Sequence, residues 1–339
     1  MKATDISGQA PGGKRTRLAA VLPLATPFVV QIFPIYACNF KCNYCIFHLD
    51  KNKRGFISDK VVMDLGLYKK CVDDMAKFPN KIKVVRFVGI GEPLLHPNIA
   101  EMVAYTASKK IARTVEMLTN ASLLTPKMSD SLISAGLTRL VVSLQGTTKE
   151  KYKEVCQTDI DFEEFVKNLR YFFENKGDTQ MYIKIIDCAL QGKDDEKKFY
   201  KIFGDLCDTI AIEHMVPIHS NVDYEKIIKG KKMSFTQFGL PVSEVKICPQ
   251  PFFHFQINPD GKIVPCYSFE YPEILGDCHE ESVVKIWNGK KFQSFRRRML
   301  DGVSQMPKIC PNCDLIKYRL FPEDVLNDDA ERLKKFYET

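Results

Sequence analysis

Short apolar runs alternate with amphipathic stretches over the first two thirds of the chain. The strand-like runs cover residues 28–35, 82–88, 114–118, 140–144, 181–186 and 209–212. Between them, the spacing of apolar residues predicts helices over 98–109, 162–174 and 196–206, one that starts at Thr125, and one that starts at an N-cap on Ser58 and includes Val61, Val62, Leu65, Leu67 and Val72. Six such strands with helices between them are typical of a parallel sheet covered by its crossover helices.

The last third of the chain has a different pattern. Residues 258–266, N-P-D-G-K-I-V-P-C, form a turn between strand-like residues and predict a β-hairpin. A helix follows Trp287 and runs through Arg296, and Trp287 is expected in the core. We therefore predict four parts: an N-terminal extension (1–26), an α/β core (27–235), a small cysteine-rich domain of a β-hairpin plus helix (236–320) and a helical tail (321–339).

Composition is consistent with a globular enzyme. The 339 residues, 45% of them hydrophobic, suffice for one large or two ordinary domains. The net charge of +7 favours an anionic substrate only slightly. The basic group formed by Lys290, Lys291 and residues 296–298 is expected to be a solvated helix face, so nucleic acid is not an expected partner. The sequence has no signal peptide and no apolar run of about 18 residues, which predicts a cytoplasmic protein without a membrane span.

Three of the twelve cysteines form a C-x3-C-x2-C motif directly after the first strand. In a reducing compartment, cysteines are expected to serve as thiolate ligands and not as disulfides. Cys38, Cys42 and Cys45 supply three thiolates for a four-iron cluster, which leaves one iron open to bind a small molecule. A zinc site or reduced core cysteines are the alternatives, although zinc sites usually combine paired C-x2-C units or histidines at set spacing.

Further motifs follow the later strands, in an order that resembles the radical SAM enzymes. The three motifs are Gly89-Ile90-Gly91-Glu92-Pro93, Thr119-Asn120-Ala121, and Val142-Ser143-Leu144-Gln145-Gly146. Tyr44, directly before the third cysteine, belongs to the same resemblance. The resemblance implies S-adenosylmethionine at the open iron, with the adenine near Tyr44 and the methionine amino group held by Gly89, Gly91, Glu92 and Pro93. Asn120, Ser143 and Gln145 are implied as further cofactor contacts. Ile90, Ala121 and Gln145 depart from the usual G-G-E-P, T-N-G and V-S-L-D-G patterns.

The same resemblance implies a fold and a place for the site. Radical SAM enzymes have a partial (β/α)6 barrel, which here is expected to cover about residues 27–216. Ligands of parallel sheets bind at the C-terminal ends of the strands, and every motif named above falls there.

Four later cysteines, Cys248, Cys266, Cys310 and Cys313, resemble the SPASM extension in its shortened twitch form. That resemblance implies one auxiliary 4Fe-4S cluster with all four ligands supplied, and thus two 4Fe-4S clusters in the protein. A zinc ribbon is the alternative, since tetrahedral zinc also accepts four thiolates. Cys278 is a possible extra ligand, with a packed or free thiol as the expectation, and Cys71 is expected to be a small buried residue.

The resemblance implies reductive cleavage of S-adenosylmethionine and abstraction of hydrogen from a substrate, driven by an external low-potential donor such as flavodoxin or ferredoxin. The extension is most similar to that of dehydrogenases acting on aminocyclitols and carbohydrates. We therefore expect dehydrogenation of a small polar substrate, such as a sugar, aminocyclitol or nucleotide-linked derivative. Epimerisation, decarboxylation, and peptide, protein or RNA modification stay open. Candidate catalytic or substrate-lining residues are Cys188, Glu213, His214, His219 and Asn221.

Overall fold

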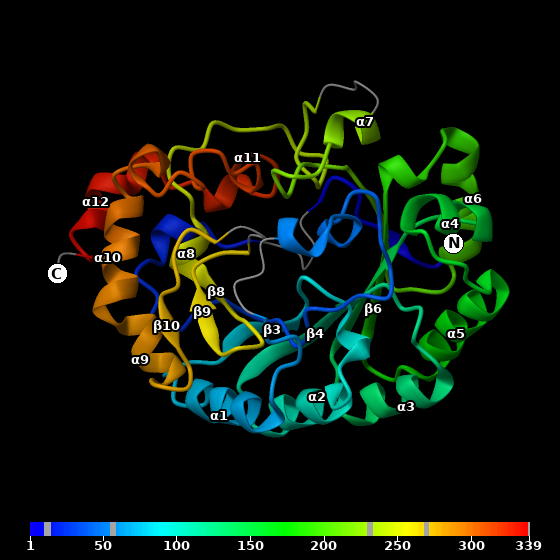
Figure 1. The fold of residues 1–339 in the computed structure, drawn as a ribbon, viewed down its shortest axis with the longest axis horizontal. Helices are drawn as coiled ribbons and strands as arrows, with labels where there is room; N and C mark the ends of the chain where they lie inside the picture. Colours follow the sequence, from blue (N-terminus) through cyan, green and yellow to red (C-terminus); the bar gives the residue numbers. More distant parts are fainter. Residues whose placement is uncertain (10–14, 55–58, 229–232, 268–270, 338–339) are drawn as a thin grey trace.

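The computed structural model describes residues 1–9, 15–54, 59–228, 233–267 and 271–337, and its strands form one ten-stranded sheet (Figure 1). The order is β1-β7-β6-β5-β4-β3-β2-β8-β9-β10. The strand bounds are β1 Thr4–Asp5, β2 Val29–Ile32, β3 Ile82–Phe87, β4 Ala112–Thr119, β5 Arg139–Leu144, β6 Gln180–Ile186, β7 Thr209–Glu213, β8 His254–Ile257, β9 Lys262–Val264 and β10 Gly276–Asp277. Strands β2 to β7 pair in parallel, which confirms the predicted partial barrel.

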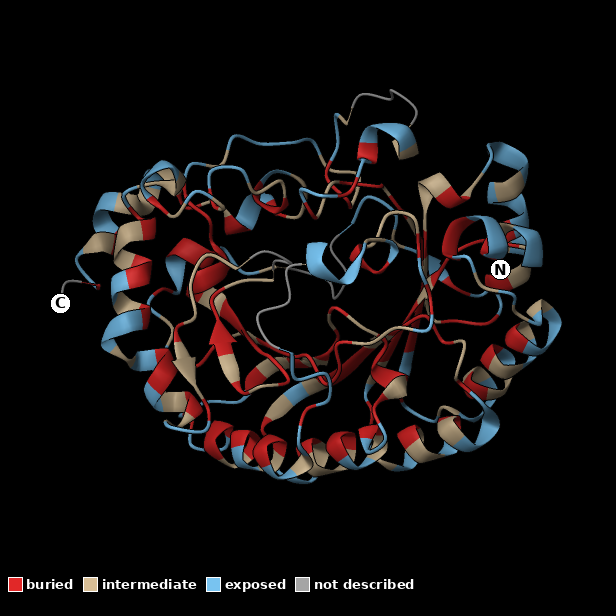
Figure 2. Cartoon of the chain, in the orientation of Figure 1, coloured by how far each residue is buried: buried red, intermediate tan, exposed pale blue. Residues whose placement is uncertain are grey.

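Several α-helices cover the outer face of this curved sheet, and the other helices of the described residues lie around its ends and its opposite side (Figure 1). Their bounds are α1 Leu65–Met75, α2 Ile99–Ser108, α3 Pro126–Ser134, α4 Lys149–Cys156, α5 Phe162–Asn175, α6 Lys193–Phe203, α7 Tyr224–Ile228, α8 Gln250–Phe253, α9 Val283–Asn288, α10 Lys290–Met299, α11 Leu315–Tyr318 and α12 Ala330–Lys334. Figure 1 shows α1, α2, α3 and α5 side by side along the convex side of the sheet, and Figure 2 shows that their buried faces point toward it. The main core therefore lies between sheet and helices.

Three predicted elements need correction. The first helix does not start at Ser58, which lies outside the described residues, but at Leu65, because the Asp64 carboxylate caps it by accepting the Leu67 N–H at 2.9 Å. Val61 and Val62 precede it and are exposed, and Val62 instead forms a β-bridge with Ile35. Helix α6 begins at Lys193, three residues before the predicted start at Glu196. Its first turn holds three acidic residues, where the helix dipole favours negative charge.

Arg296 is the third correction: it is buried and not on a solvated face. Its Nε donates to the Pro251 carbonyl and its Nη1 donates to the Trp287 carbonyl, each at 2.9 Å. The guanidinium lies 3.9 Å from the Trp287 ring centroid and 4.0 Å from that of Phe292. Trp287 is itself buried, as predicted. The helix that carries the basic residues thus packs on the core through one of them.

The cysteine-rich extension continues the barrel sheet. Strand β8 pairs in parallel with β2, and β9 and β10 follow it in antiparallel order, so the predicted hairpin is present as β8 and β9. The predicted domain boundaries at residues 26, 235 and 320 stay predictions. The pairing of β8 with β2 joins core and extension in one hydrogen-bonded sheet. No helix in the described ranges combines the length and apolar character that crossing a membrane requires.

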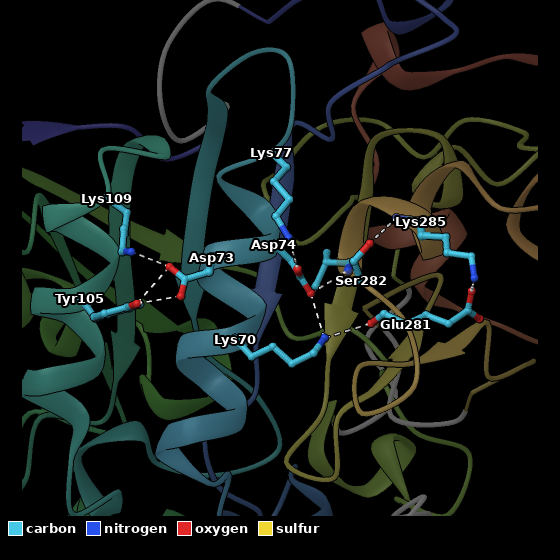
Figure 3. A network of polar contacts seen from close by, with 10 residues as sticks. Lys70, Asp73, Asp74, Lys77, Tyr105, Lys109, Glu281, Ser282 and Lys285 are labelled. Atoms are coloured by element: carbon cyan, nitrogen blue, oxygen red, sulfur yellow. Dashed lines mark hydrogen bonds and ion pairs between the residues drawn. The ribbon is translucent and has the colours of Figure 1, made fainter.

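A polar network joins α1 to the start of α9 (Figure 3). The buried Asp74 carboxylate accepts hydrogen bonds from Lys70 and Lys77, each at 2.9 Å, and from the Val283 N–H at 3.4 Å. Lys70 also donates to the Glu281 carbonyl at 3.2 Å. Beside this network, Cys71 and Cys278 are both fully buried, as expected for packed thiols. The extension is therefore held against the barrel by side chains as well as by the sheet.

Candidate active site

The three-cysteine loop follows β2 and rests on α4. The Lys41 N–H donates to the Cys156 carbonyl at 3.0 Å, and the Asn43 N–H donates to the Val155 carbonyl at 2.9 Å. These carbonyls belong to the last turn of α4, where they lack partners within the helix. The C-terminal end of a helix that the sequence pattern did not predict thus fixes the path of the loop.

The loop brings Cys38, Cys42 and Cys45 together. Cys42 is buried and the other two are half-buried. Burial raises the pKa of Cys38 to about 12, and nearby Glu92 and Cys45 add to that rise. A hydrogen bond with the Cys156 thiol, together with burial, raises the pKa of Cys42 well above its usual value. Thiols in such a setting become thiolates only when a metal centre compensates the charge, which suits ligands of a cluster.

Two glycines let the segment after β3 approach this loop. Gly89 and Gly91 have φ angles of +146° and +152°, a region that residues with a Cβ avoid. A Cβ on Gly89 would lie 2.5 Å from the Phe33 ring, and a Cβ on Gly91 would overlap the Ile35 carbonyl oxygen. The Glu92 N–H then donates to the Ala37 carbonyl at 2.8 Å. Close approach of two backbones is the physical reason for glycine at these positions.

Glu92 presents a buried carboxylate to the cavity at the C-terminal ends of the strands. Its Oε1 accepts from the Thr119 hydroxyl at 2.5 Å and the Leu94 N–H at 3.0 Å, and its Oε2 accepts from the Asn120 N–H at 2.7 Å. Burial raises its pKa to about 7, although these three donors work in the opposite direction. Among the described residues, no cationic side chain lies within ion-pair distance of it. A ligand ammonium group would fit this carboxylate.

The turn after β4 is tied to the cysteine loop. Asn120 Nδ2 donates to Asn39 Oδ1 at 3.0 Å and lies 3.9 Å from the Cys38 sulfur. Its Oδ1 accepts from the Ser122 N–H at 2.9 Å and the Ser122 hydroxyl at 2.7 Å. Ala121 has a φ of +58°, a left-handed conformation that glycine adopts without strain. This accounts for the glycine that the T-N-G pattern has at this position.

On the other side of the cavity, Tyr44 donates its phenolic hydrogen to Gln145 Oε1, and Gln145 Nε2 donates to the Ser143 carbonyl at 3.0 Å. All three residues line the same cavity of about 230 Å³ as the three cysteines, Glu92 and Asn120. The structure therefore brings the predicted cofactor residues to one cavity, except Pro93, which starts the turn beneath it. Their individual roles in cofactor binding stay predictions.

A second polar group lies in the same cavity, nearer the extension. The buried Glu213 carboxylate accepts hydrogen bonds from Lys184 Nζ at 2.5 Å and Gln237 Nε2 at 2.6 Å, and Gln237 Oε1 accepts from the Arg319 guanidinium. Burial alone would raise the pKa of Glu213, but Lys184, Gln237 and Arg319 outweigh it and hold the pKa below its usual value. We name Lys184, Glu213, Gln237 and Arg319 the polar quartet.

Of the other predicted residues, only His214 lines this cavity. Its Nδ1 lies 3.0 Å from Asp187 Oδ2, and this contact raises its pKa. Cys188 packs with Tyr44 and Tyr224 outside the cavity lining. His219 is buried and its Nδ1 accepts the Asn221 N–H at 3.1 Å, while Asn221 Nδ2 donates to the Lys53 carbonyl at 3.1 Å. The last two residues therefore shape the loop after β7.

The four later cysteines line a separate, small cavity of about 30 Å³ in the extension. Cys248 precedes α8, Cys266 follows β9, and Cys310 and Cys313 lie between α10 and α11. Most of their other neighbours are apolar, including Pro251, Phe295, Met299, Leu315 and Ile316, and Gln250 is polar. Burial raises the pKa of Cys310 to about 12 and raises that of Cys248 and Cys266 further, and the thiols raise one another. Cys278 does not line this cavity.

In the described part of the chain, no three His, Cys, Asp or Glu side chains gather tightly enough to hold a single metal ion. The ligands of a four-iron cluster bind different irons and therefore lie further apart than the ligands of one zinc ion. Four thiols around a mostly apolar cavity fit a cluster of this kind. Likewise, three thiols beside a carboxylate without a cationic partner fit a cluster with a bound ammonium-bearing ligand.

Comparison with protein-family models identifies the chain. The model of the radical SAM superfamily matches residues 32–197, and the model of the SPASM iron-sulfur cluster-binding domain matches residues 248–314. The chain belongs to the radical SAM superfamily and carries a SPASM domain. It is thus a radical SAM enzyme that uses iron–sulfur and S-adenosylmethionine.

Relatives of this radical SAM protein include two that it matches over most of their length. It is 32% identical over 316 residues to a GTP 3′,8-cyclase of Chlorobaculum tepidum. It is 23% identical over 280 residues to an S-adenosyl-L-methionine-dependent 2-deoxy-scyllo-inosamine dehydrogenase of Niallia circulans. Each match covers 82% of this chain and 88% of the relative. Its fold is similar to that of Streptococcus suis SuiB bound to S-adenosylmethionine, with a TM-score of 0.60 and 15% identity over 91% of this chain and 77% of SuiB.

Sequence reasoning missed three members of the polar quartet. Lys184 lies in the middle of an apolar strand, which was a usable signal, because a cation in a buried strand requires a partner. Gln237 and Arg319 carried no such signal, since both come from segments without regular periodicity and reach the barrel only through the tertiary fold.

Proposed function

We propose that this protein is an oxidoreductase that dehydrogenates a small polar substrate, such as a sugar, an aminocyclitol or a nucleotide-linked derivative. The observation that supports this most is the position of the polar quartet between the two groups of cysteines. It lines the cavity of Cys38, Cys42 and Cys45, and the Arg319 guanidinium lies 5.0 Å from the ring centroid of Tyr267, the residue that follows Cys266. A substrate at the quartet would lie between both sites.

Each of the two groups of cysteines has a separate proposed role in the reaction. The first three cysteines would hold a 4Fe-4S cluster and Glu92 would help to hold S-adenosylmethionine, which together would supply hydrogen-atom abstraction. The later four cysteines would hold a second 4Fe-4S cluster, which would supply an electron acceptor. Glu92 orients the amino group of the cofactor through its charge. An external low-potential donor, such as flavodoxin or ferredoxin, is the proposed source of electrons.

Within the chain, Glu213 is the proposed base. Oxidation of an alcohol to a ketone requires that the hydroxyl proton leaves, and the Glu213 carboxylate is ionised at neutral pH because Lys184 lowers its pKa. A substrate hydroxyl that takes the place of the Lys184 amine would remove the main stabilising cation and make Oε2 a better proton acceptor. Lys184 and Arg319 then orient the substrate by hydrogen bonds.

The test is a screen of candidate substrates in which two products are measured. Formation of 5′-deoxyadenosine reports cofactor cleavage, and the ketone reports oxidation. Glu213→Gln should keep cofactor cleavage but form the ketone at least 100-fold more slowly, since a general base contributes about 10²- to 10⁴-fold. The exposed Glu163→Gln is the matched control and should behave like the parent. Deuterium from solvent at an inverted carbon of the product would instead show epimerisation and overturn the proposal.

A further inference from the structure

A second, larger cavity occupies the inside of the barrel below the polar quartet. It measures about 480 Å³ and shares Lys184, Glu213, Gln237 and Arg319 with the cavity of the cysteines, so the two spaces meet at the quartet. We call it the inner chamber; its distinctive lining residues are Gln31, Lys83, Arg86, Arg113, Arg139 and His254. It lies toward the N-terminal ends of the strands, away from every motif found in the sequence.

The inner chamber is polar because of the register of the sheet. Gln31 of β2 pairs with Arg86 of β3, Arg86 pairs with Glu116 of β4, and Glu116 pairs with Arg139 of β5. Alternate residues of a strand share a face, and all four of these line the chamber. Glu116 forms ion pairs with both arginines, which leaves this layer with one more positive than negative charge.

Positive charge without a partner gathers at the far end of the chamber. Lys83 is partly exposed and Arg113 is exposed. Lys83 Nζ donates to the Thr16 hydroxyl at 3.3 Å and lies 3.4 Å from the Phe28 ring centroid, and in the ranges that the structure describes neither Lys83 nor Arg113 has a carboxylate within ion-pair distance. Burial, Arg113 and Arg15 lower the pKa of Lys83, although Arg15 is itself paired at 2.6 Å with Asp324, which also lines the chamber. Such a group is stabilised when an anion binds.

Two buried side chains in the chamber also lack hydrogen-bond partners. Gln31 and His254 are 5% and 3% exposed, and Gln31 Oε1 and His254 Nε2 have no partner among the described residues. Burial and nearby Arg86 lower the pKa of His254 to about 3, so its ring is neutral and its Nε2 can donate or accept. Buried polar atoms in native structures normally have partners, which indicates a ligand or ordered water at this place.

We propose that the inner chamber binds a phosphoryl-bearing tail of the substrate, while the carbon to be oxidised lies above the quartet. This rests on the proposed function, since it extends the same substrate site. The span suits the assignment: from Thr119, which contacts Glu92, to Arg113 are six residues of β4, or roughly 20 Å at about 3.3 Å per residue. A substrate that reaches from one end to the other must therefore carry its phosphoryl group at the end opposite the reacting carbon.

Calorimetry with inorganic pyrophosphate tests the site in the protein with its clusters reconstituted and S-adenosylmethionine present. Pyrophosphate should bind the parent, and Lys83→Gln combined with Arg113→Gln should weaken binding about ten- to a hundredfold, as expected for lost charge-assisted hydrogen bonds. Lys81→Gln, an exposed lysine outside the chamber, is the matched control and should bind like the parent. Absence of binding to the parent, or equal binding by all variants, would overturn the proposal.

Acetylation of lysines and the binding of larger phosphorylated compounds test the same anion site in two further ways. In the parent, pyrophosphate should protect Lys83 but not Lys81 from acetylation, which tests the site even if the double variant does not fold. Phosphorylated sugars and nucleoside-diphosphate sugars should bind more tightly than pyrophosphate; if none does, the chamber holds a free anion and the assignment to a substrate tail is wrong. These readouts do not involve oxidation, so they can succeed or fail independently of the dehydrogenase assay.

Discussion

The Glu92 carboxylate accepts the backbone N–H of Asn120 at 2.7 Å, which ties the end of β3 to the end of β4 directly beside the cysteine loop. A carboxylate held in one orientation by three donors loses no further freedom when it binds an ammonium group. This preorganisation makes Glu92 the best-placed group in the cavity for the amino group of S-adenosylmethionine.

We predict that Glu92→Gln weakens the binding of S-adenosylmethionine about ten- to a hundredfold, because a charge-assisted hydrogen bond contributes roughly 1.5–3 kcal/mol. The affinity can be measured by equilibrium dialysis on reconstituted protein. The absorption of the clusters should be unchanged, and Glu101→Gln on the surface of α2 serves as the control. Equal affinity of parent and Glu92→Gln would limit Glu92 to a structural role in the turn.

The affinity for S-adenosylmethionine should also depend on pH. Burial raises the pKa of Glu92 to about 7, so the carboxyl is mostly protonated and neutral at about pH 6 and mostly ionised above about pH 7.5. Since the ionised form attracts the ammonium group, affinity should rise about five- to tenfold over this range, below the pKa of an α-amino group near 7.7–8.0. The Glu92→Gln variant should show a flat profile, and a flat profile in the parent would contradict the assignment.

Most strands could be predicted from the sequence because buried parallel strands form largely apolar runs, as residues 82–88 do despite Lys83 and Arg86. The glycine and cysteine motifs were equally visible, since close backbone approach and metal ligation demand specific residues. Helix α4 was missed because its sequence, K-E-K-Y-K-E-V-C, is polar apart from its buried Tyr152, Val155 and Cys156. Its role in supporting the cysteine loop depends on contacts between distant segments.

Other features follow only from tertiary pairing. The alignment of β8 with β2 joins residues more than 200 positions apart, and no local pattern encodes it. Arg296 looked like its partly exposed neighbours because a run of arginines on a helix gives no sign of which one faces inward. The inner chamber likewise depends on register, since Gln31 and Arg139 become members of the same layer only in the assembled sheet.

Gly91→Ala should disrupt the first cluster site. A Cβ at position 91 would overlap the Ile35 carbonyl oxygen, so the backbone that leads into Cys38 would have to move. We expect reconstituted Gly91→Ala to retain roughly half the iron of the parent, as one of two equal clusters is lost, and to cleave no S-adenosylmethionine. Metal analysis and 5′-deoxyadenosine formation check this.

Gly177→Ala is the matched control for that experiment. Gly177 also has a positive φ, +54°, but a Cβ there would meet no atom within 4 Å. This variant should lose only about 1 kcal/mol of stability through backbone strain and keep its full iron content. If Gly177→Ala lost as much iron as Gly91→Ala, strain rather than close approach would explain the effect.

Arg296→Ala should strongly destabilise the protein. It removes the donors of two buried carbonyls, those of Pro251 and Trp287, and leaves a cavity beside the Trp287 ring. We expect a loss of about 3–5 kcal/mol in the free energy of unfolding, measured by chemical denaturation. Arg297→Ala, whose side chain pairs with Asp301 on the surface, should cost less than about 1 kcal/mol. Similar losses in both variants would contradict the buried role of Arg296.

The number of clusters can be tested by combining cysteine substitutions with metal analysis. If Cys38, Cys42 and Cys45 hold one four-iron cluster and Cys248, Cys266, Cys310 and Cys313 hold another, then replacing the first three by Ala should halve the iron and abolish cleavage of S-adenosylmethionine. Cys310→Ala should instead preserve cleavage but abolish the oxidised product, because the electron acceptor is lost.

Cys278→Ala is the control, since this buried thiol lies outside the cavity of the four later cysteines, and its iron content should equal that of the parent. Stoichiometric zinc in anaerobically purified protein would show that the later cysteines form a zinc site.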